Sequence, residues 1–151
     1  MIGYWNQPEL TATTLRDGWL HSGDIGTMDA DGHLYILDRL KDMIVTSGNN
    51  VYPKEVEIVI FEHPAVQSVA VAGLPDEVRG ETVHAFVVLR PGAAATAAEI
   101  IEHCRRNLAR FKVPRGITFV DEMPLTGSGK IRRFKLRELA RARAAAPGDR
   151  G

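Results

Sequence analysis

Two runs of β-branched and apolar residues, 66–74 and 82–89, constrain the fold of this chain more than any other feature. Each run is apolar on both of the faces that a strand presents, a pattern typical of strands that are covered on both sides. The polar segment 75–80, PDEVRG, joins them as a loop. The sequence therefore predicts two buried strands in a sheet that has cover on both faces.

Helix signals surround these two strands. Pro53 suits the first position of a helix, and Glu55 and Glu57 lie near the positive end of its dipole. Thr96 and Glu99 form a T-x-x-E capping box, which begins a second helix. The other expected elements are a strand at 43–46, a turn at 47–50, a strand at 117–120 and a final helix at 134–142. This mixture predicts a small α+β domain with an antiparallel sheet flanked by helices.

The segment before residue 38 is different, because it is rich in Gly, Asp and Trp. Asp31 and Gly32 supply a turn with positive φ between two extended runs, which predicts a β-hairpin at 26–37. A calcium loop is excluded, because twelve-residue spacing from Asp29 puts Leu40 where a bidentate glutamate is required. The five histidines show neither helical ligand spacing nor a partner cysteine cluster, so no metal site is expected.

Charge and cysteine content exclude several functional classes. The 19 Lys and Arg residues balance 19 Asp and Glu residues, so net charge offers no case for binding nucleic acid or an anionic membrane. The basic tail after Lys130 lacks interleaved aromatic residues, which indicates a solvated helix face. No stretch approaches the roughly 20 apolar residues of a transmembrane segment. The single cysteine, Cys104, recurs with the apolar positions of its helix and predicts a core residue in a cytoplasmic protein.

The segment 124–133, PLTGSGKIRR, carries the strongest chemical signal of the chain. Glycines on both sides of Ser128 precede Lys130, and glycine lets a backbone approach a ligand closely. A Walker phosphate loop is excluded, because Pro124 stands in place of its first glycine and Ile131 in place of its Ser or Thr. A mobile loop that presents one lysine to developing phosphate or carboxylate charge remains. The alternative is a solvated lysine in a glycine-rich turn.

Five motifs in a fixed order give the chain a family resemblance. They are GYWN at 3–6, DGWLHSGD at 17–24, D-x-D-G at 29–32, DRLKDMIVTSGNNVYPKEVE at 38–57 and PLTGSGKIRR at 124–133. In this order and at these spacings they resemble the C-terminal third of the adenylate-forming (AMP-binding) superfamily of acyl-CoA synthetases, luciferases and peptide-synthetase adenylation domains. The likeness covers nearly the whole chain and is closest to the fatty-acid and aryl-acid CoA ligase branch.

The resemblance implies roles for five residues. Asp24 accepts hydrogen bonds from the ribose hydroxyls of the adenylate, and Arg39 contacts the same ribose or the phosphate. Lys41 is the hinge, whose backbone torsions absorb a large rotation of the C-terminal domain. Lys130 serves the first half-reaction, in which ATP and a carboxylate form acyl-adenylate and pyrophosphate. After rotation, Gly48 lines the pantetheine channel in which the CoA thioester forms.

Each of these residues also has an ordinary structural interpretation. Without the resemblance, Asp24 is a turn cap, and Arg39 and Lys41 belong to a solvated charge run. Gly48 is then a turn glycine with permissive φ.

The resemblance also implies a division of the chain. Residues 1–38 are the last portion of an N-terminal adenylation domain, 39–42 the hinge, 43–145 the mobile C-terminal domain and 146–151 a disordered tail. The phosphate loop, the segment around adenine and Mg²⁺ and the acyl pocket belong to the rest of the N-terminal domain, which is the expected partner. We expect a fragment of an ATP-dependent ligase for a fatty or aryl acid. The full enzyme uses ATP, CoA and Mg²⁺, none of which this chain is expected to bind tightly alone.

The fragment is expected to have little or no activity by itself, and its exposed former interface favours self-association or an altered packing of residues 1–38. A second functional class stays open, a non-catalytic interaction or regulatory module that keeps the fold and has lost the reaction. The intact set of Asp24, Arg39, Lys41 and Lys130 favours the ligase, because a pure binding module does not need it. Nucleic-acid binding through the basic tail is a more distant alternative.

Overall fold

The computed structural model describes residues 1–145 of the 151-residue chain, and the tail expected at 146–151 lies outside them. The chain divides into two compact units between Lys41 and Asp42. The expected division into 1–38, a hinge at 39–42 and a domain from 43 stays a prediction. No helix within the described residues is both long and apolar enough to cross a membrane.

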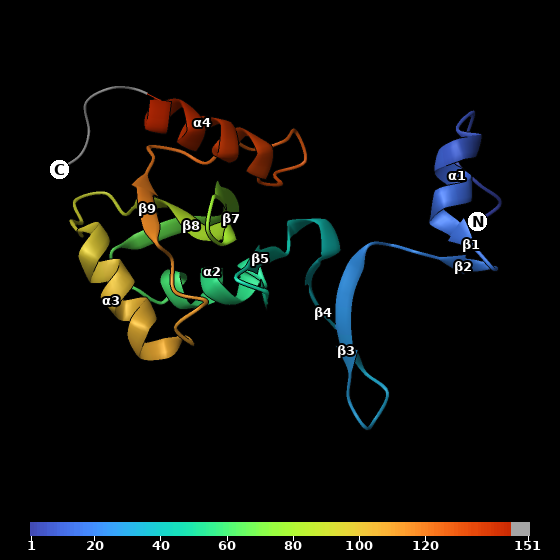
Figure 1. Cartoon of the computed structure of the whole chain (residues 1–151), viewed down its shortest axis with the longest axis horizontal. Helices are drawn as coiled ribbons and strands as arrows, with labels where there is room; N and C mark the ends of the chain where they lie inside the picture. Colours follow the sequence, from blue (N-terminus) through green and yellow to red (C-terminus); the bar gives the residue numbers. More distant parts are fainter. Residues whose placement is uncertain (146–151) are drawn as a thin grey trace. The chain divides into compact units, whose positions relative to one another are not determined.

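The first unit, Met1–Lys41, consists of one short helix and two antiparallel strand pairs (Figure 1). Its elements are α1 Pro8–Thr14, β1 Leu15–Arg16, β2 Trp19–Leu20, β3 Asp24–Met28 and β4 Leu34–Arg39. Strands β3 and β4 form the expected hairpin, and Gly32 takes a φ of +85° in its turn. The Asp29 carboxylate closes this turn by accepting the backbone N–H groups of Asp31 and His33 at 3.0 and 2.8 Å.

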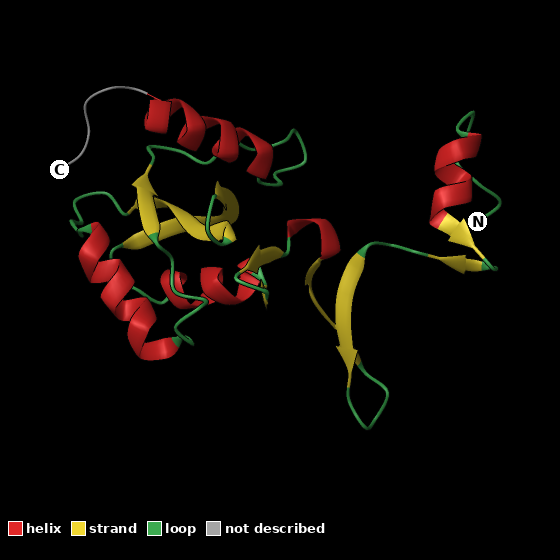
Figure 2. Cartoon of the chain, in the orientation of Figure 1, coloured by secondary structure: helices red, strands yellow, loops and turns green. Residues whose placement is uncertain are grey.

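The second unit, which begins at Asp42, is a five-stranded sheet with helices on both faces (Figure 2). Its elements follow the 3-10 turn η1 Leu40–Asp42 and are β5 Ile44–Thr46, β6 Asn49–Val51, α2 Pro53–Phe61, β7 Val66–Asp76, β8 Gly80–Leu89, α3 Ala97–Asn107, β9 Gly116–Phe119 and α4 Arg133–Ala145. The strand order is β6-β5-β8-β7, and β9 pairs with β8. The expected α+β class is confirmed.

One pairing in this sheet differs from the antiparallel pattern of the others. Strand β9 runs parallel to β8, and a parallel neighbour needs a long crossover, which α3 supplies.

The loop expected at 75–80 is shorter in the structure. Pro75 and Asp76 pair with Glu81 and Gly80 at the end of the β7–β8 ladder, so the connection is left with residues 77–79.

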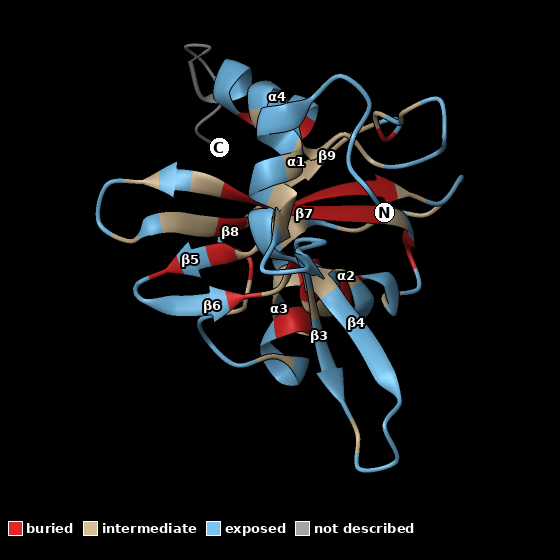
Figure 3. Cartoon of the chain, turned by 90° about the vertical axis from the view of Figure 1, so that its right-hand side faces the viewer, coloured by how far each residue is buried: buried red, intermediate tan, exposed pale blue. Residues whose placement is uncertain are grey.

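The two long strands separate two hydrophobic cores, because successive residues of a strand point to opposite faces. The first core lies between the sheet and helices α2 and α3, and includes Val69, Val71, Val83, Ala85, Val87, Ile60 and Ile100. The second core lies between the sheet and α4, and consists of Ala70, Ala72, Phe86, Val88, Met123, Leu136 and Ala140. Figure 3 shows the buried centre of β7 and β8 in red. The prediction that both strands are covered on both faces is confirmed.

Cys104 is fully buried in the first core, as the helix periodicity predicted. Burial raises the pKa of its thiol to about 11, because a thiolate is disfavoured away from water. The thiol is therefore protonated at neutral pH and is not a nucleophile.

The first unit has no such core. None of residues 1–41 is buried, and β3 and β4 are exposed along most of their length (Figure 3). Its large exposed apolar side chains include Ile2, Trp5, Trp19, Leu20, Met28 and Leu34. Exposed apolar surface of this extent is typical of an interaction site.

The capping box at the start of α3 is formed, and it yields a stability prediction. Thr96 Oγ1 accepts the backbone N–H of Glu99 at 3.2 Å, and the Glu99 carboxylate accepts the backbone N–H of Thr96 at 2.7 Å. Thr96→Ala removes this acceptor, so we expect the free energy of unfolding to fall by about 1 kcal/mol in urea denaturation. Thr96→Ser keeps the hydroxyl and is the control; an alanine variant as stable as the serine variant would contradict the prediction.

Candidate functional site

Asp24 and Arg39, the residues expected to bind ribose, lie opposite each other across the β3–β4 hairpin. The strand register pairs their Cα atoms, and Arg39 Nε donates to Asp24 Oδ1 at 2.9 Å. The hydrogen bond from Arg39 lowers the pKa of the Asp24 carboxyl, and the Ser22 hydroxyl lowers it further. Asp24 is therefore ionised at neutral pH and can only accept hydrogen bonds.

Lys41, the expected hinge, is the last residue of the first unit. A shallow hollow next to the Asp24–Arg39 pair is lined by Ser22, Gly23, Arg39, Leu40 and Lys41. The Leu40 N–H donates to the Gly23 carbonyl oxygen at 2.8 Å and holds the two chain segments of this hollow together. The structure thus brings Arg39 and Lys41 to one place in the first unit, while the hinge role of Lys41 stays a prediction.

Lys130 lies in a narrow, hydrogen-bonded hairpin, and the mobility expected of this segment stays a prediction. We name residues 124–132 the lysine hairpin. The Thr126 N–H donates to the Lys130 carbonyl oxygen at 2.8 Å, and the Lys130 N–H donates to Thr126 Oγ1 at 3.0 Å. Leu125 and Ile131 form an antiparallel bridge below these bonds. Gly129 takes a φ of +79° in the turn, which suits glycine. Lys130 is exposed in this hairpin.

Gly48 lies in the two-residue turn between β5 and β6. Ser47 and Gly48 take φ values of +49° and +79°, which a tight hairpin turn requires. The turn is shorter than the expected 47–50, because Asn49 and Asn50 already pair with β5. A Cβ added at Gly48 would meet no atom within 4 Å, so backbone conformation, and not crowding within this chain, favours glycine there.

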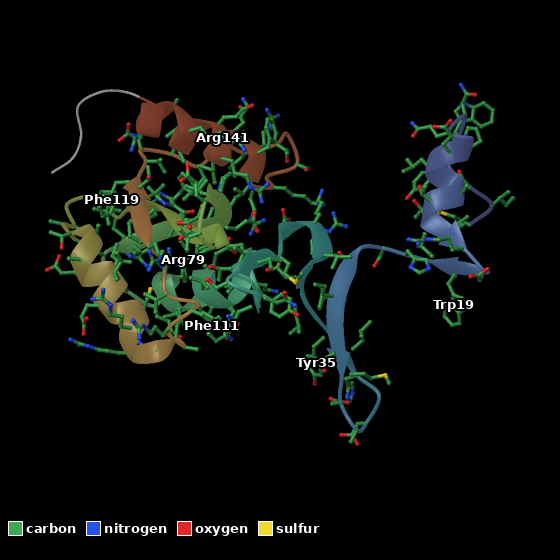
Figure 4. The ribbon with its side chains drawn as sticks, in the orientation of Figure 1. Trp19, Tyr35, Arg79, Phe111, Phe119 and Arg141 are labelled. Carbon is green, nitrogen blue, oxygen red and sulfur yellow. The ribbon has the colours of Figure 1, made fainter. Side chains whose placement is uncertain are left out.

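A cationic hollow beside this turn was not predicted from the sequence. We name it the arginine hollow, and its lining consists of Thr46, Ser47, Arg79, Thr82, Val83, Arg110, Phe111, Val113 and Arg115. Arg79 and Phe111 are labelled in Figure 4. Asp76 Oδ1 lies 3.6 Å from a terminal guanidinium nitrogen of Arg79, so this carboxylate offsets part of the positive charge of the hollow. Three arginine residues and one phenylalanine therefore line one space, which suits an anionic ligand.

One carboxylate and histidine cluster lies in the turn of the β3–β4 hairpin. Among residues 1–145, the group close enough to share a metal ion is Asp29, Asp31 and His33, whose ligand atoms lie within 4.8 Å of one another. All three are exposed, and the Asp29 carboxylate already accepts two backbone N–H groups and the Tyr35 hydroxyl, the last at 2.9 Å. These hydrogen bonds account for the geometry of the turn, so we assign it no metal ion.

The chain is similar to known proteins over nearly its whole length. Residues 55–130 match the family described as AMP-binding enzyme C-terminal domain. A long-chain-fatty-acid–CoA ligase from Bacillus subtilis (strain 168) is 54% identical over 138 residues, which are 91% of this chain and 25% of the relative. A feruloyl-CoA synthase from Amycolatopsis sp is 47% identical over 137 residues, 91% of this chain and 28% of the relative.

Solved structures agree with these sequence relatives. The crystal structure of ATP-bound MatB from Rhodopseudomonas palustris matches with a TM-score of 0.86 and 41% sequence identity. The match covers 91% of this chain and 27% of that chain. The chain thus spans about a quarter of the length of the proteins that it resembles.

Proposed function

Because the chain belongs to the family of AMP-binding enzyme C-terminal domains, we propose that it supplies the adenylation lysine and the CoA-binding surface of an acyl-CoA ligase. In the first half-reaction, a carboxylate oxygen of the acid attacks the α-phosphorus of ATP, and pyrophosphate leaves as the acyl-adenylate forms. In the second, the sulfur of CoA attacks the acyl carbon, the thiol gives up its proton and AMP leaves. The family match over residues 55–130, which ends on Lys130, is the observation that carries the proposal.

Lys130 is the catalytic residue of the first half-reaction. Its ammonium is a compact charge that can contact the carboxylate and the α-phosphate together, and such stabilisation in a dry site is worth several kcal/mol. The lysine hairpin exposes this side chain, so it can enter a site on a partner N-terminal adenylation domain. Among residues 1–145, the cluster of Asp29, Asp31 and His33 in the β3–β4 turn does not fit Mg²⁺ well, because the Asp29 carboxylate already accepts two backbone N–H groups. We therefore assign Mg²⁺ and the phosphate loop to that partner domain.

Asp24 and Arg39 bind the ribose of the adenylate. The ionised Asp24 carboxylate accepts the ribose hydroxyls, and its hydrogen bond with Arg39 fixes its orientation. The Arg39 side chain is half exposed and can reach the same ribose or the phosphate. Lys41, which follows this pair, is proposed as the hinge. Rotation about it between the half-reactions takes the lysine hairpin out of the active site and brings the Gly48 turn in.

Gly48 lines the path of the pantetheine arm, and the arginine hollow beside it receives the nucleotide end of CoA. Arginine is well suited to phosphate, and the Phe111 ring can stack on adenine. We expect Arg110→Ala to raise the KM for CoA about 10-fold while pyrophosphate release in the absence of CoA stays unchanged. Steady-state rates at varied CoA concentration give this value. Arg106→Ala, near the end of α3 and outside the lining of the hollow, is the control; an equal KM shift in both variants would contradict the assignment.

The acid is proposed to be a fatty or an aryl acid. Two relatives that are 54% and 47% identical bear the names long-chain-fatty-acid–CoA ligase and feruloyl-CoA synthase. The acyl pocket is assigned to the partner N-terminal adenylation domain. A cytoplasmic location is proposed as well, because a protein with one buried, reduced cysteine suits a reducing compartment.

The test measures pyrophosphate release with ATP, Mg²⁺ and a panel of fatty and aryl acids. It compares the chain alone with the chain plus a separately expressed N-terminal adenylation domain from the Bacillus relative. We expect little or no turnover by the chain alone and turnover by the mixture. Turnover by the chain alone would contradict the prediction that the fragment is inactive by itself. If a mixture of two folded partners releases no pyrophosphate, the second candidate function is favoured. In that case the chain is a non-catalytic module that docks or self-associates through the exposed apolar surface of the first unit.

A further inference from the structure

Arg133 contacts three separate parts of the second unit. It is the first residue of α4 and follows Lys130 by three positions. Its Nε donates to the Val71 carbonyl oxygen at 3.1 Å, and one terminal nitrogen donates to Glu57 Oε1 at 2.7 Å. The other terminal nitrogen lies 3.8 Å from Asp42 Oδ2. One guanidinium therefore joins α4 to β7, to α2 and to the segment that follows Lys41.

These contacts are largely shielded from solvent. The side chains of Arg133, Glu57 and Asp42 expose 20%, 18% and 14% of their surface. Glu57 Oε1 also accepts the Val71 N–H at 2.9 Å, so both backbone groups of Val71 are bonded although β7 is the last strand in the sheet order. A charge-assisted pair with shared partners and low exposure holds its geometry better than a surface ion pair.

The lysine hairpin has few other anchors. None of residues 124–130 is buried. Its apolar attachment comes from Met123 and Ile131, which pack in the second core. The Arg132 N–H closes the base by donating to the Pro124 carbonyl oxygen at 2.8 Å. Arg133 follows this base directly, so its three contacts are positioned to fix where the hairpin leaves the domain.

We propose that Arg133 is a positioning residue for the adenylation half-reaction, because it fixes the base of the lysine hairpin to the domain side of the hinge. This role rests on the proposed function of Lys130 and Lys41. Arg133 and its partners all belong to the second unit, so their contacts do not cross the boundary after Lys41. Rotation about Lys41 then moves the anchor and Lys130 together. Thioester formation uses the Gly48 turn instead and does not depend on this anchor.

The first experiment tests the anchor in the isolated chain and does not depend on enzymatic activity. In Arg133→Gln, we expect the N–H groups of Thr126, Lys130 and Arg132 to exchange with deuterium about 10-fold faster, while the amides of β8 are unchanged. Arg137→Gln is the matched control. Arg137 lies one turn further along α4 and donates to the Gly73 carbonyl oxygen at 3.3 Å, so within residues 1–145 it contacts β7 without Glu57 or Asp42. Unchanged hairpin exchange in a folded Arg133→Gln chain overturns the proposal.

The second experiment separates the two half-reactions in the mixture with the N-terminal adenylation domain. We expect Arg133→Gln to lower the kcat of pyrophosphate release about 100-fold, with the KM for ATP within about 3-fold. Formation of the CoA thioester from supplied acyl-adenylate should stay within about 3-fold. Arg133→Lys, which keeps the charge and loses the planar fork, should recover part of the rate. Arg137→Gln should leave both half-reactions at the wild-type rate.

Equal losses in the two half-reactions, or an equal effect of Arg133→Gln and Arg137→Gln, would overturn the positioning role and indicate a structural one. Asp42→Asn is a milder variant for the case that Arg133→Gln does not fold, and we expect it to slow pyrophosphate release about 10-fold with the same selectivity. A wild-type mixture without activity would contradict the proposed function instead. Even in that case, the rate of hydrogen exchange in the lysine hairpin of Arg133→Gln decides whether Arg133 anchors the hairpin.

Discussion

We expect Lys130→Ala to lower the rate of acyl-adenylate formation by about 100- to 1000-fold in the presence of the N-terminal adenylation domain. In the proposed function, the lysine ammonium is the charge that this chain brings to the carboxylate and the α-phosphate, and alanine leaves the developing charge without it. Single-turnover measurement of pyrophosphate release isolates this step. Formation of the CoA thioester from supplied acyl-adenylate should be nearly unchanged, because we propose that this step uses the Gly48 side of the second unit.

Two controls make the effect of Lys130→Ala specific. Lys135→Ala removes an exposed lysine of α4 five positions later and should leave both half-reactions at the wild-type rate. Lys130→Arg keeps the charge with a larger, planar head and should restore activity only in part. A Lys130→Ala mixture with wild-type pyrophosphate release would contradict the catalytic assignment.

We expect Phe86→Ala to destabilise the second unit by about 4 kcal/mol. Phe86 is fully buried in the second core, where β8 packs with Leu136 and Met123, and truncation leaves a cavity under α4. Because domains of this size are stable by only about 5–15 kcal/mol, this loss is a large fraction of the total. Chemical denaturation followed by circular dichroism measures it.

Phe61→Ala is the matched control for Phe86→Ala. The Phe61 side chain lies on α2 and is 53% exposed, so its truncation should cost less than about 1 kcal/mol. Equal stability losses in the two variants would contradict the two-core description of this unit.

The two long strands and the helices around them could be predicted because their signals are local. Two apolar runs gave β7 and β8, and Pro53 and Thr96 gave the starts of α2 and α3. The parallel pairing of β9 with β8 could not be derived in this way, because the partner of a strand is set by distant packing and not by its own residues. The short helix α1 was not predicted either, although Pro8 occupies a favourable first position.

The candidate site was predicted only where a motif or the family resemblance carried it. The resemblance named Asp24 and Arg39, and the hairpin register supplies the reason for their pairing. The closed lysine hairpin was not expected, because the Thr126 hydroxyl and backbone form bonds that no glycine pattern reveals. The arginine hollow was missed because Arg79 comes from one connection and Arg110 and Arg115 from another, which only the folded sheet brings together.

The most direct test of the proposed function replaces the C-terminal quarter of the Bacillus subtilis long-chain-fatty-acid–CoA ligase with this chain and measures acyl-CoA formation from a fatty acid, ATP and CoA. We expect the fused protein to form acyl-CoA, whereas the same ligase without its C-terminal quarter and the fused protein carrying Lys130→Ala do not. A folded fused protein that binds ATP and the fatty acid but forms neither acyl-adenylate nor acyl-CoA would contradict the proposed function.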